Sequence, residues 1–326
     1  MRSTELILAS ITVLGGVGLV GCGTTPAPAD AFTPSTDDSG MVVGEDAPAA
    51  GTPRAVVGTA SMNMPADTAC LGSNTAPTAG AEVGGTITFE ALALTPFPVA
   101  MGNAEVYPGA SIRATCDGDC VEGTTDAMGR LMAELPGGGW FGYRLAAAGT
   151  GSTASVPVIG QFYTWGSEAG GNVTVTAISS SVADIIAGQL NRELSPTTSA
   201  VSGSIRDCDG EEVANIQIRF FRGDTEIVSG AADDVTSPRI VGLGDGAIPS
   251  PNRNGLTGYQ GRFAGIVPSA GGAVRIEAYG VIEDGGSPVL VGCEEVLVEP
   301  GTVTVAVMPA LRGDYAAGST CAGRGE

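Results

Sequence analysis

The chain has 326 residues, 51 of them glycine and 20 proline, and a formal net charge of −20 at pH 7. All 15 cationic side chains are arginine, and there is no histidine. Without His or Lys the chain lacks His-based nucleophile arrangements, His-containing zinc sites and Schiff-base chemistry. Such an acidic surface also repels the phosphate backbone of nucleic acids. We therefore predict a protein that is not an enzyme, uses no cofactor or metal, and does not bind nucleic acid.

Residues 1–21 have the pattern of a signal peptide, with an apolar run from Leu6 to Val20 that ends at Gly21-Cys22. The run suits a secretory leader and is short for a membrane span. Its end resembles the bacterial lipobox, which predicts acylation of Cys22 and attachment to a membrane through it. The following Gly23, in place of Asp, resembles the pattern of outer-membrane lipoproteins. The alternative is an ordinary signal peptide in which Cys22 is incidental.

Residues 22–60 are rich in Thr, Pro, Ala, Gly and Asp and show no apolar periodicity. Such a composition cannot bury a core, so we predict a disordered tether between the membrane and the folded part.

A repeated signature organises the rest of the chain. Thr125-x3-Gly129-Arg130 returns as Thr257-x3-Gly261-Arg262, and a proline follows each glycine after seven residues, at Pro136 and Pro268. Turns alternate with Val-, Ile- and Thr-rich runs in both copies, which is typical of β-strands. We expect an all-β fold of two tandem β-sandwiches, at 61–179 and 200–311. The strand candidates lie at 85–90, 109–115, 140–145, 156–158 with 162–163, 173–176, 201–206, 213–220, 274–278, 289–291 with Cys293, and 303–307.

Residues 180–199 interrupt this β pattern and predict one short connecting helix. Ser181 is a candidate N-cap, and Pro196 ends the element. Apolar residues at helical spacing indicate a buried face, although a partner-binding helix would show the same stripe; they are Val182, Ile185, Ile186, Leu190 and Leu194.

The second unit carries a Gly-, Asp- and Pro-rich insert at 229–254, which we expect to be a long loop, functional or disordered. A loose tail follows at 312–326.

Six cysteines remain besides Cys22, and an even number in an exported chain favours three disulfides. Cys116 and Cys120 flank a tight turn and form the most natural pair. Cys208 and Cys293 bracket the second unit and form the next, which leaves Cys70 with Cys321. A redox or metal role for Cys116 and Cys120 is the alternative, but the spacing and the acidic flanks disfavour it.

Two groups of side chains suggest ligand sites. Trp140, Tyr143, Tyr163 and Trp165 could form a sugar-stacking platform, although aromatic side chains in an aromatic-poor chain more often fill the core. The acidic turns near Asp117, Asp207 and Asp233 could bind calcium, but no EF-hand pattern is present and turns use Asp and Gly in any case.

The repeated strand, Thr-x3-Gly-Arg turn and proline resemble the carboxypeptidase regulatory-like domain, a small transthyretin-like β-sandwich. The layout also resembles exported lipoproteins of the myxobacterial type. The resemblance implies an accessory module without peptidase activity. We expect a lipid-anchored envelope protein on the outer membrane, periplasmic or surface-facing, that acts as a non-catalytic structural or binding module. The alternative is an adhesion-type binder whose partner is a cell-surface glycan or another envelope protein.

Overall fold

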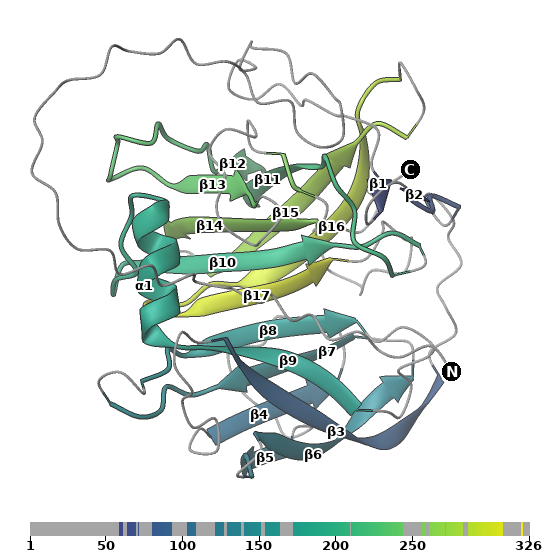
Figure 1. Cartoon of the computed structure of the whole chain (residues 1–326), viewed down its shortest axis with the longest axis vertical. Coiled ribbons are helices and arrows are strands. Elements are labelled where there is room, and N and C mark those ends of the chain that lie inside the picture. Colours follow the sequence, from purple (N-terminus) through teal and green to yellow (C-terminus); the bar gives the residue numbers. More distant parts are fainter. Residues whose placement is uncertain are drawn as a thin grey trace, which may run out of the picture.

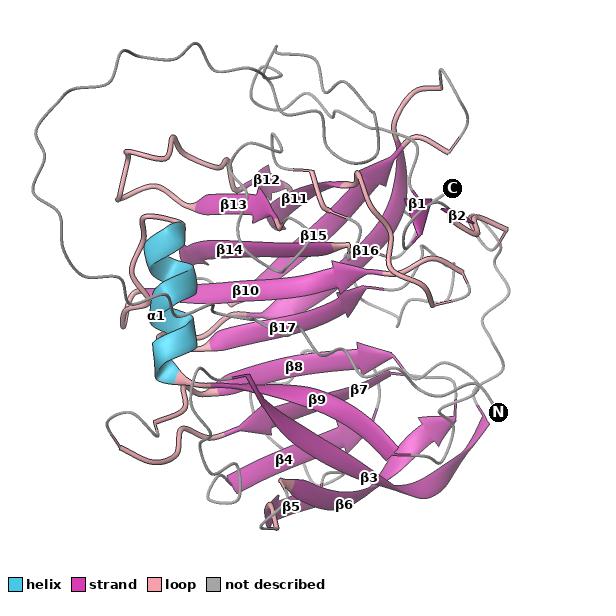
Figure 2. Ribbon diagram, viewed as in Figure 1, coloured by secondary structure: helices cyan, strands magenta, loops and turns pink. Residues whose placement is uncertain are grey.

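The computed structural model describes residues 59–60, 64–69, 71, 80–92, 103–108, 121–126, 129–137, 140–150, 154–163, 172–208, 210–243, 256–258, 261–270, 272–282, 286–308 and 321. The predicted signal peptide, most of the predicted tether, the strand candidate at 109–115 and the segment from Cys116 to Cys120 lie outside these residues. The described chain is built from β-strands with one helix, α1 (Ser180–Gln189), between two tandem β-sandwiches (Figures 1 and 2). The predicted all-β class is confirmed.

The first repeat contains two groups of strands. A three-stranded sheet has the order β6-β3-β9, and a second group has the order β5-β4-β7-β8. The strands are β3 (Gly80–Leu92), β4 (Asn103–Pro108), β5 (Val121–Thr124), β6 (Arg130–Gly137), β7 (Trp140–Leu145), β8 (Val158–Tyr163) and β9 (Asn172–Ile178). A short pair, β1 (Thr59–Ala60) and β2 (Met64–Pro65), precedes them.

The second repeat has the same topology. The order β14-β10-β17 reproduces β6-β3-β9, and β12-β11-β15-β16 reproduces β5-β4-β7-β8. Both repeats contain one parallel pair in the same place, β3 with β9 and β10 with β17. The strands are β10 (Thr198–Ile205), β11 (Gln217–Arg222), β12 (Thr225–Glu226), β13 (Arg239–Gly242), β14 (Arg262–Pro268), β15 (Ala273–Gly280), β16 (Val289–Leu297) and β17 (Val303–Met308). The repeat read from the sequence is therefore a repeat of topology.

The two repeats share a sheet. Strand β8 of the first repeat pairs in parallel with β17 of the second, with Val158 opposite Val303. This pairing joins both repeats into one eight-stranded sheet of order β13-β14-β10-β17-β8-β7-β4-β5. Because main-chain hydrogen bonds continue from one repeat into the next, the two sandwiches are not separate domains joined only by a linker.

The two cores lie on opposite faces of the shared sheet. Alternate residues of a strand point to opposite faces. On β17, Val303 and Val307 pack with β7, β8, β9 and α1, whereas Ala306 and Met308 pack with β11, β15 and β16. The three-stranded sheet and α1 therefore cover one face, and β12-β11-β15-β16 covers the other (Figure 1).

The repeated signature marks the entry to β6 and β14. Gly129 and Gly261 have φ of 72° and 58°, a left-handed conformation that favours glycine. A Cβ at Gly261 would also lie 2.7 Å from the carbonyl oxygen of Ile205. The threonine of each copy is buried; the Oγ1 of Thr257 accepts from the N–H of Ile216 and donates to the carbonyl of Val213. In the second repeat the signature is thus a turn that the buried threonine hydroxyl stabilises from the inside.

The helix begins earlier than predicted. Ser179, not Ser181, is the N-cap, and its Oγ accepts from the N–H of Val182. Asn191 takes a left-handed φ of 53° and ends the element before Leu194. The face of α1 that packs against the sheet includes the small residues Ala183 and Ala187 as well as larger ones. Ile185, which was predicted on that face, is instead 43% exposed. The buried residues are Val182, Ala183, Ala187 and Leu190.

Part of the expected loop at 229–254 has regular structure. Residues 239–242 form β13, which adds an edge strand to the shared sheet beside β14. The preceding turn is closed by the N–H of Gly230, which donates to the carbonyl of Pro238, and by Ser229, whose hydroxyl bonds the main chain of Ile240. Glycine and proline in this segment form a tight turn before β13. Composition alone does not distinguish such a turn from a long irregular loop.

Candidate functional site

The aromatic platform expected from the sequence does not include Tyr143. This side chain lies in the core of the first repeat and is 1% exposed, and a Cβ on Gly160 would collide with its ring. Tyr143 is therefore a packing residue rather than a ligand contact. Trp140 and Tyr163 are backbone neighbours across the β7–β8 ladder, but their side chains and all of Trp165 lie outside the described residues.

The disulfide pairing differs from the prediction. Cys293 is bonded to Cys321, with Cα atoms 5.7 Å apart, so the Cys208–Cys293 and Cys70–Cys321 pairings are wrong. Cys293 lies opposite Glu277, so it projects from the face of β16 that points away from the core of the second sandwich. Its partner Cys321 comes from the segment that follows the last strand. Cys208 is also in a disulfide. Cys70, Cys116 and Cys120 lie outside the described residues.

The acidic turns are used for local structure. The carboxylate of Asp207 accepts from the N–H groups of Asp67 and Glu211, both at 2.9 Å. Asp234 accepts from the hydroxyl of Ser237 and from Thr236, and these bonds hold its pKa below the ordinary value. No group of three or more His, Cys, Asp or Glu able to hold a metal occurs among the residues the structure describes.

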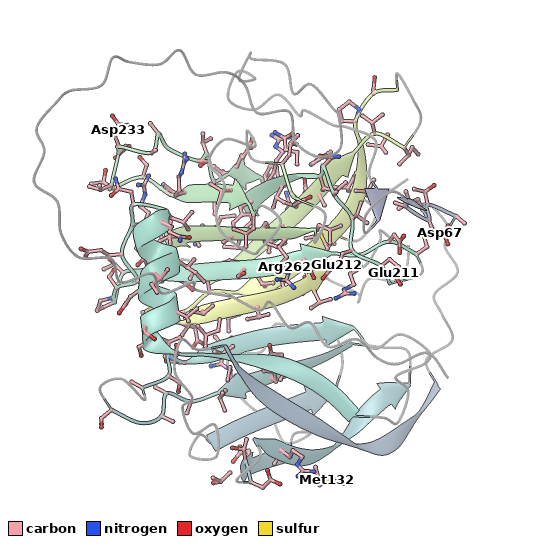
Figure 3. The ribbon with its side chains drawn as sticks, viewed as in Figure 1. Asp67, Met132, Glu211, Glu212, Asp233 and Arg262 are labelled. Atoms are coloured by element: carbon pink, nitrogen blue, oxygen red, sulfur yellow. A yellow bond between two sulfur atoms is a disulfide. The ribbon has the colours of Figure 1, made fainter. Side chains whose placement is uncertain are left out.

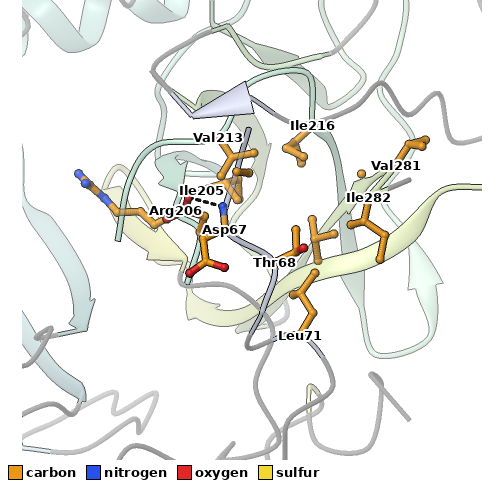
Figure 4. Close-up of a pocket in the computed structure, with 13 residues that line it drawn as sticks. Asp67, Thr68, Leu71, Ile205, Arg206, Val213, Ile216, Val281 and Ile282 are labelled. Atoms are coloured by element: carbon orange, nitrogen blue, oxygen red, sulfur yellow. Dashed lines mark hydrogen bonds between the residues drawn. The ribbon is translucent and has the colours of Figure 1, made fainter. Parts of the chain in front are cut away.

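A small pocket lies where the segment 66–71 crosses the end of the second sandwich (Figure 4). Its volume is about 80 Å³, and its wall is mostly apolar, including Leu71, Ile205, Val213, Ile216 and Val281. Ligand pockets usually measure about 300–1,000 Å³. This pocket is therefore packing space under the segment that closes the core.

Next to this pocket, three charged side chains meet at the end of β10. Arg206 Nη2 lies 3.6 Å from Glu212 Oε1, and Arg262 lies beside Glu212 (Figure 3). Burial raises the pKa of Glu212 against the lowering effect of the two arginines, and burial lowers the pKa of Arg262. The signature arginine of the second repeat is thus part of a half-buried charge cluster, whereas Arg130 of the first repeat is exposed and pairs with Asp126.

A buried ion pair lies on the face of β15 that points away from the core of the second sandwich. Arg275 and Glu277 are 3% and 1% exposed, and the Arg275 Nε donates to Glu277 Oε1 at 2.8 Å. Arg219 and Arg275 both stack over Phe221, and Tyr279 donates to Glu277. Every charge in this cluster has a partner, so it serves the structure.

Glu294 on β16 is a buried carboxylate of a different kind. It lies opposite Ile276, a core residue, and therefore faces the interior of the second sandwich. Both its oxygens are buried and have no hydrogen-bond partner among the described residues, and burial raises its pKa well above the ordinary value. Burial therefore favours the neutral form of this side chain.

A groove lined by both polar and apolar side chains lies beside the C-terminal end of α1. Its volume is about 530 Å³, within the range of ligand sites. Three segments form it: the loop after α1, the turn before β13 and the end of β14. The lining residues are Gly188, Asn191, Arg192, Glu193, Ser195, Thr197, Thr198, Val235, Thr236, Ser237, Pro238, Ile266, Val267 and Pro268.

Arg192 builds this groove. It is 6% exposed, and its guanidinium donates to the main-chain carbonyls of Asn191, Ala231 and Ser237. These contacts fasten the turn before β13 to the loop that follows α1. Arg192 was not predicted as a site residue, because its only local signal is its place just after the helix, where cations are favourable.

Neither a family model nor a curated protein matches this chain. Among solved structures, it is similar to a Bacillus anthracis TIE protein (13% identity, 70% of this chain, 34% of that chain, TM-score 0.21). It is also similar to a minor pilin of Streptococcus agalactiae (13%, 70%, 95%, 0.22) and a streptococcal ancillary pilin (11%, 71%, 70%, 0.18). This chain spans about a third of the Bacillus protein. With TM-scores this low, none of these similarities supports an argument about site or function.

Within the described part of the chain, no helix has both the length and the apolar character needed to span a bilayer.

Proposed function

We propose that this protein is a lipid-anchored, non-catalytic structural and binding module of the cell envelope. The observation that carries the proposal is the pairing of β8 with β17, which makes two sandwiches one body. A module that displays a binding surface at a distance from a membrane gains from such a rigid body, because the surface keeps its shape on a flexible tether.

The cross-link between Cys293 and Cys321 supports the same proposal, because disulfides persist in oxidising compartments outside the cytoplasm. The acylated Cys22 and the outer-membrane location remain proposals drawn from the lipobox resemblance. The absence of His and Lys from the whole chain supports a non-catalytic role.

Replacement of the proposed anchor tests the localisation. We expect labelled palmitate to be incorporated into the wild-type protein and into Gly23→Asp, but not into Cys22→Ala. Cys22→Ala should leave the membrane fraction. Gly23→Asp should stay membrane-bound but move from the outer-membrane to the inner-membrane fraction. Palmitate incorporation into Cys22→Ala, or its unchanged sedimentation with membranes, would refute the anchor.

A further inference from the structure

Cys208 has a disulfide partner among the cysteines outside the described residues. Cys208 is bonded, and Cys293 and Cys321 are bonded to one another. The chain has seven cysteines, so the partner of Cys208 is one of four: Cys22, Cys70, Cys116 or Cys120. The described residues around Cys208 select one of them.

The segment 66–71 lies directly against Cys208. The N–H of Cys208 donates to the carbonyl of Asp67 at 3.1 Å, and the N–H of Asp67 donates to Asp207 Oδ2 at 2.9 Å. Asp67, Thr68 and Leu71 lie over the apolar residues at the end of the second sandwich (Figure 4). The two hydrogen bonds therefore hold residue 67 beside the main chain of residues 207 and 208.

The chain turns back directly after this contact. The N–H of Leu71 donates to the carbonyl of Thr68 at 3.1 Å, as in a β-turn, and the N–H of Ala69 donates to Asp67 Oδ1 at 2.9 Å. Leu71 then packs against the core of the second sandwich and against the disulfide of the tail. Cys70 follows Asp67 by three residues, so the chain between them spans at most about 10 Å.

The two cysteines that precede β5 are separated from Cys208 by most of the shared sheet. Strand β5 lies five strands from β10 in the order β10-β17-β8-β7-β4-β5, which is about 24 Å at about 4.8 Å per strand. The chain stays in the sheet as far as Arg206, whose N–H donates to the carbonyl of Met308, so Cys208 is two residues from the sheet. The Cα atoms of a disulfide lie within about 7 Å of each other. Cys120, next to β5, is therefore out of reach, and Cys116 reaches Cys208 only with nearly fully extended chain on both sides.

We propose that a disulfide between Cys70 and Cys208 makes the segment 66–71 a covalent strap across the end of the second sandwich. The two thiols transfer two electrons and two protons to a disulfide oxidant as their sulfur atoms join. Cys22 is the proposed acylation site, and an acylated sulfur cannot form a disulfide. Only this exclusion of Cys22 rests on the proposed function.

The strap determines where the tether joins the folded body. The strand that follows the strap in sequence, β3, belongs to the first repeat, but the strap itself is fastened to the second. A pull on the tether passes through the bond at Cys208 to the second sandwich and bypasses β3. The first repeat therefore stays folded without carrying the load of the tether.

Peptide mapping of the purified, exported protein tests the assignment. Free thiols are alkylated in urea without reductant, and the chain is then digested with trypsin. Because all 15 cationic side chains are arginine, cleavage places Cys70 in 55–113, Cys116 and Cys120 in 114–130, and Cys208 in 207–219. We expect a joined peptide of 55–113 and 207–219 that separates on reduction.

The other possible peptides distinguish the two proposals. A joined peptide of 114–130 and 207–219 would overturn the strap and leave the anchor unaffected. A joined peptide of 3–54 and 207–219 would overturn both the strap and the acylation of Cys22. The expected peptide of 55–113 and 207–219, found in a protein that incorporates no palmitate, would refute only the anchor.

Matched serine variants give a second measurement. In Cys70→Ser, Cys208 should change from almost fully protected to almost fully alkylated in urea without reductant. In Cys116→Ser, which removes a cysteine of the first repeat, Cys208 should stay protected. A protected Cys208 in the first variant, or an alkylated one in the second, would contradict the strap. The map of the wild-type protein does not depend on how well either variant folds.

Discussion

Arg144 on β7 holds Glu299, which lies just after β16 in the other repeat, in a two-point ion pair. Its Nη1 and Nη2 donate to the two carboxylate oxygens at 3.0 and 2.6 Å. Both side chains are partly shielded from solvent, at 19% and 31% exposure. The contact spans the seam, which is the junction where β8 pairs with β17. It therefore adds a side-chain ion pair to the main-chain hydrogen bonds that already join the two repeats.

This seam predicts that both repeats unfold together. Both tryptophans, at 140 and 165, belong to the first repeat, whereas far-UV circular dichroism reports on both repeats. We expect the two signals to give coincident urea transitions. A double-mutant cycle with Arg144→Gln and Glu299→Gln should give a coupling energy of about 1 kcal/mol. Two separate transitions in the wild-type protein would show that the seam does not couple the repeats.

The cross-link at the tail predicts a defined peptide and a defined loss of stability. Digestion under non-reducing conditions should yield a peptide that joins Cys293 to Cys321, and none that joins Cys208 to Cys293. The bond closes a loop of 28 residues, so the paired change of both cysteines to alanine should lower the free energy of unfolding by roughly 3–4 kcal/mol. Recovery of a Cys208–Cys293 peptide would contradict the structure.

Glu294 predicts an unusual dependence of stability on pH. Its pKa is raised above the ordinary value of 4.5, so the folded state holds a proton that the unfolded chain releases. This group's contribution is therefore fully present below pH 4.5 and is lost as the pH rises toward the folded pKa. Glu294→Met, which fills the same space without a charge, should raise the free energy of unfolding at pH 8 by roughly 1–4 kcal/mol.

Chemical denaturation at pH 5 and pH 8 measures this effect. The gain from Glu294→Met should be smaller at pH 5 than at pH 8. Glu122→Gln, a change at an exposed carboxylate of β5, serves as the control and should alter neither value. A Met variant that is less stable than the wild type at pH 8 would show that Glu294 has a stabilising partner.

Two glycines separate the effect of backbone conformation from that of packing. Gly223 and Gly261 have nearly equal φ of 57° and 58°. A Cβ at Gly223 meets nothing within 4 Å, whereas one at Gly261 meets the main chain of Ile205 and Val213 at 2.7–2.9 Å. We expect Gly223→Ala to cost about 1 kcal/mol and Gly261→Ala about 1–3 kcal/mol more, measured by urea denaturation. Equal losses would mean that the close approach at the signature turn relaxes freely.

The sequence predicted most strands because their side chains alternate between a core and another environment. The runs at 140–145 and 173–176 became β7 and β9 with little change in their limits. It was less accurate where residue type alone is ambiguous. Ser179 and Ser181 are both acceptable N-caps, and only the packing of Ala183 and Ala187 against the sheet selects the first.

The candidate site could not be predicted from the sequence. The aromatic residues predicted Tyr143 as a ligand contact, but its side chain lies in the core. A large side chain on a strand can point to either face, and the sequence alone does not say which. Arg192 of the groove binds the carbonyls of Ala231 and Ser237, which lie 39 and 45 residues further along the chain, and no local pattern connects them. They meet because the turn before β13 folds back against the loop that follows α1.

By itself, the sequence determined the β class, the tandem repeat and the chemistry that the chain lacks, because these follow from side-chain periodicity, matched spacing and residue inventory. Only the tertiary structure decided that β8 and β17 fuse the repeats, that Cys293 bonds to Cys321, and that Arg192 fastens the turn before β13 to the loop after α1. The physical reason is that each of these results depends on which distant segments pack together. Strand edges, thiols and guanidinium groups are alike in local sequence, and the fold alone selects their partners.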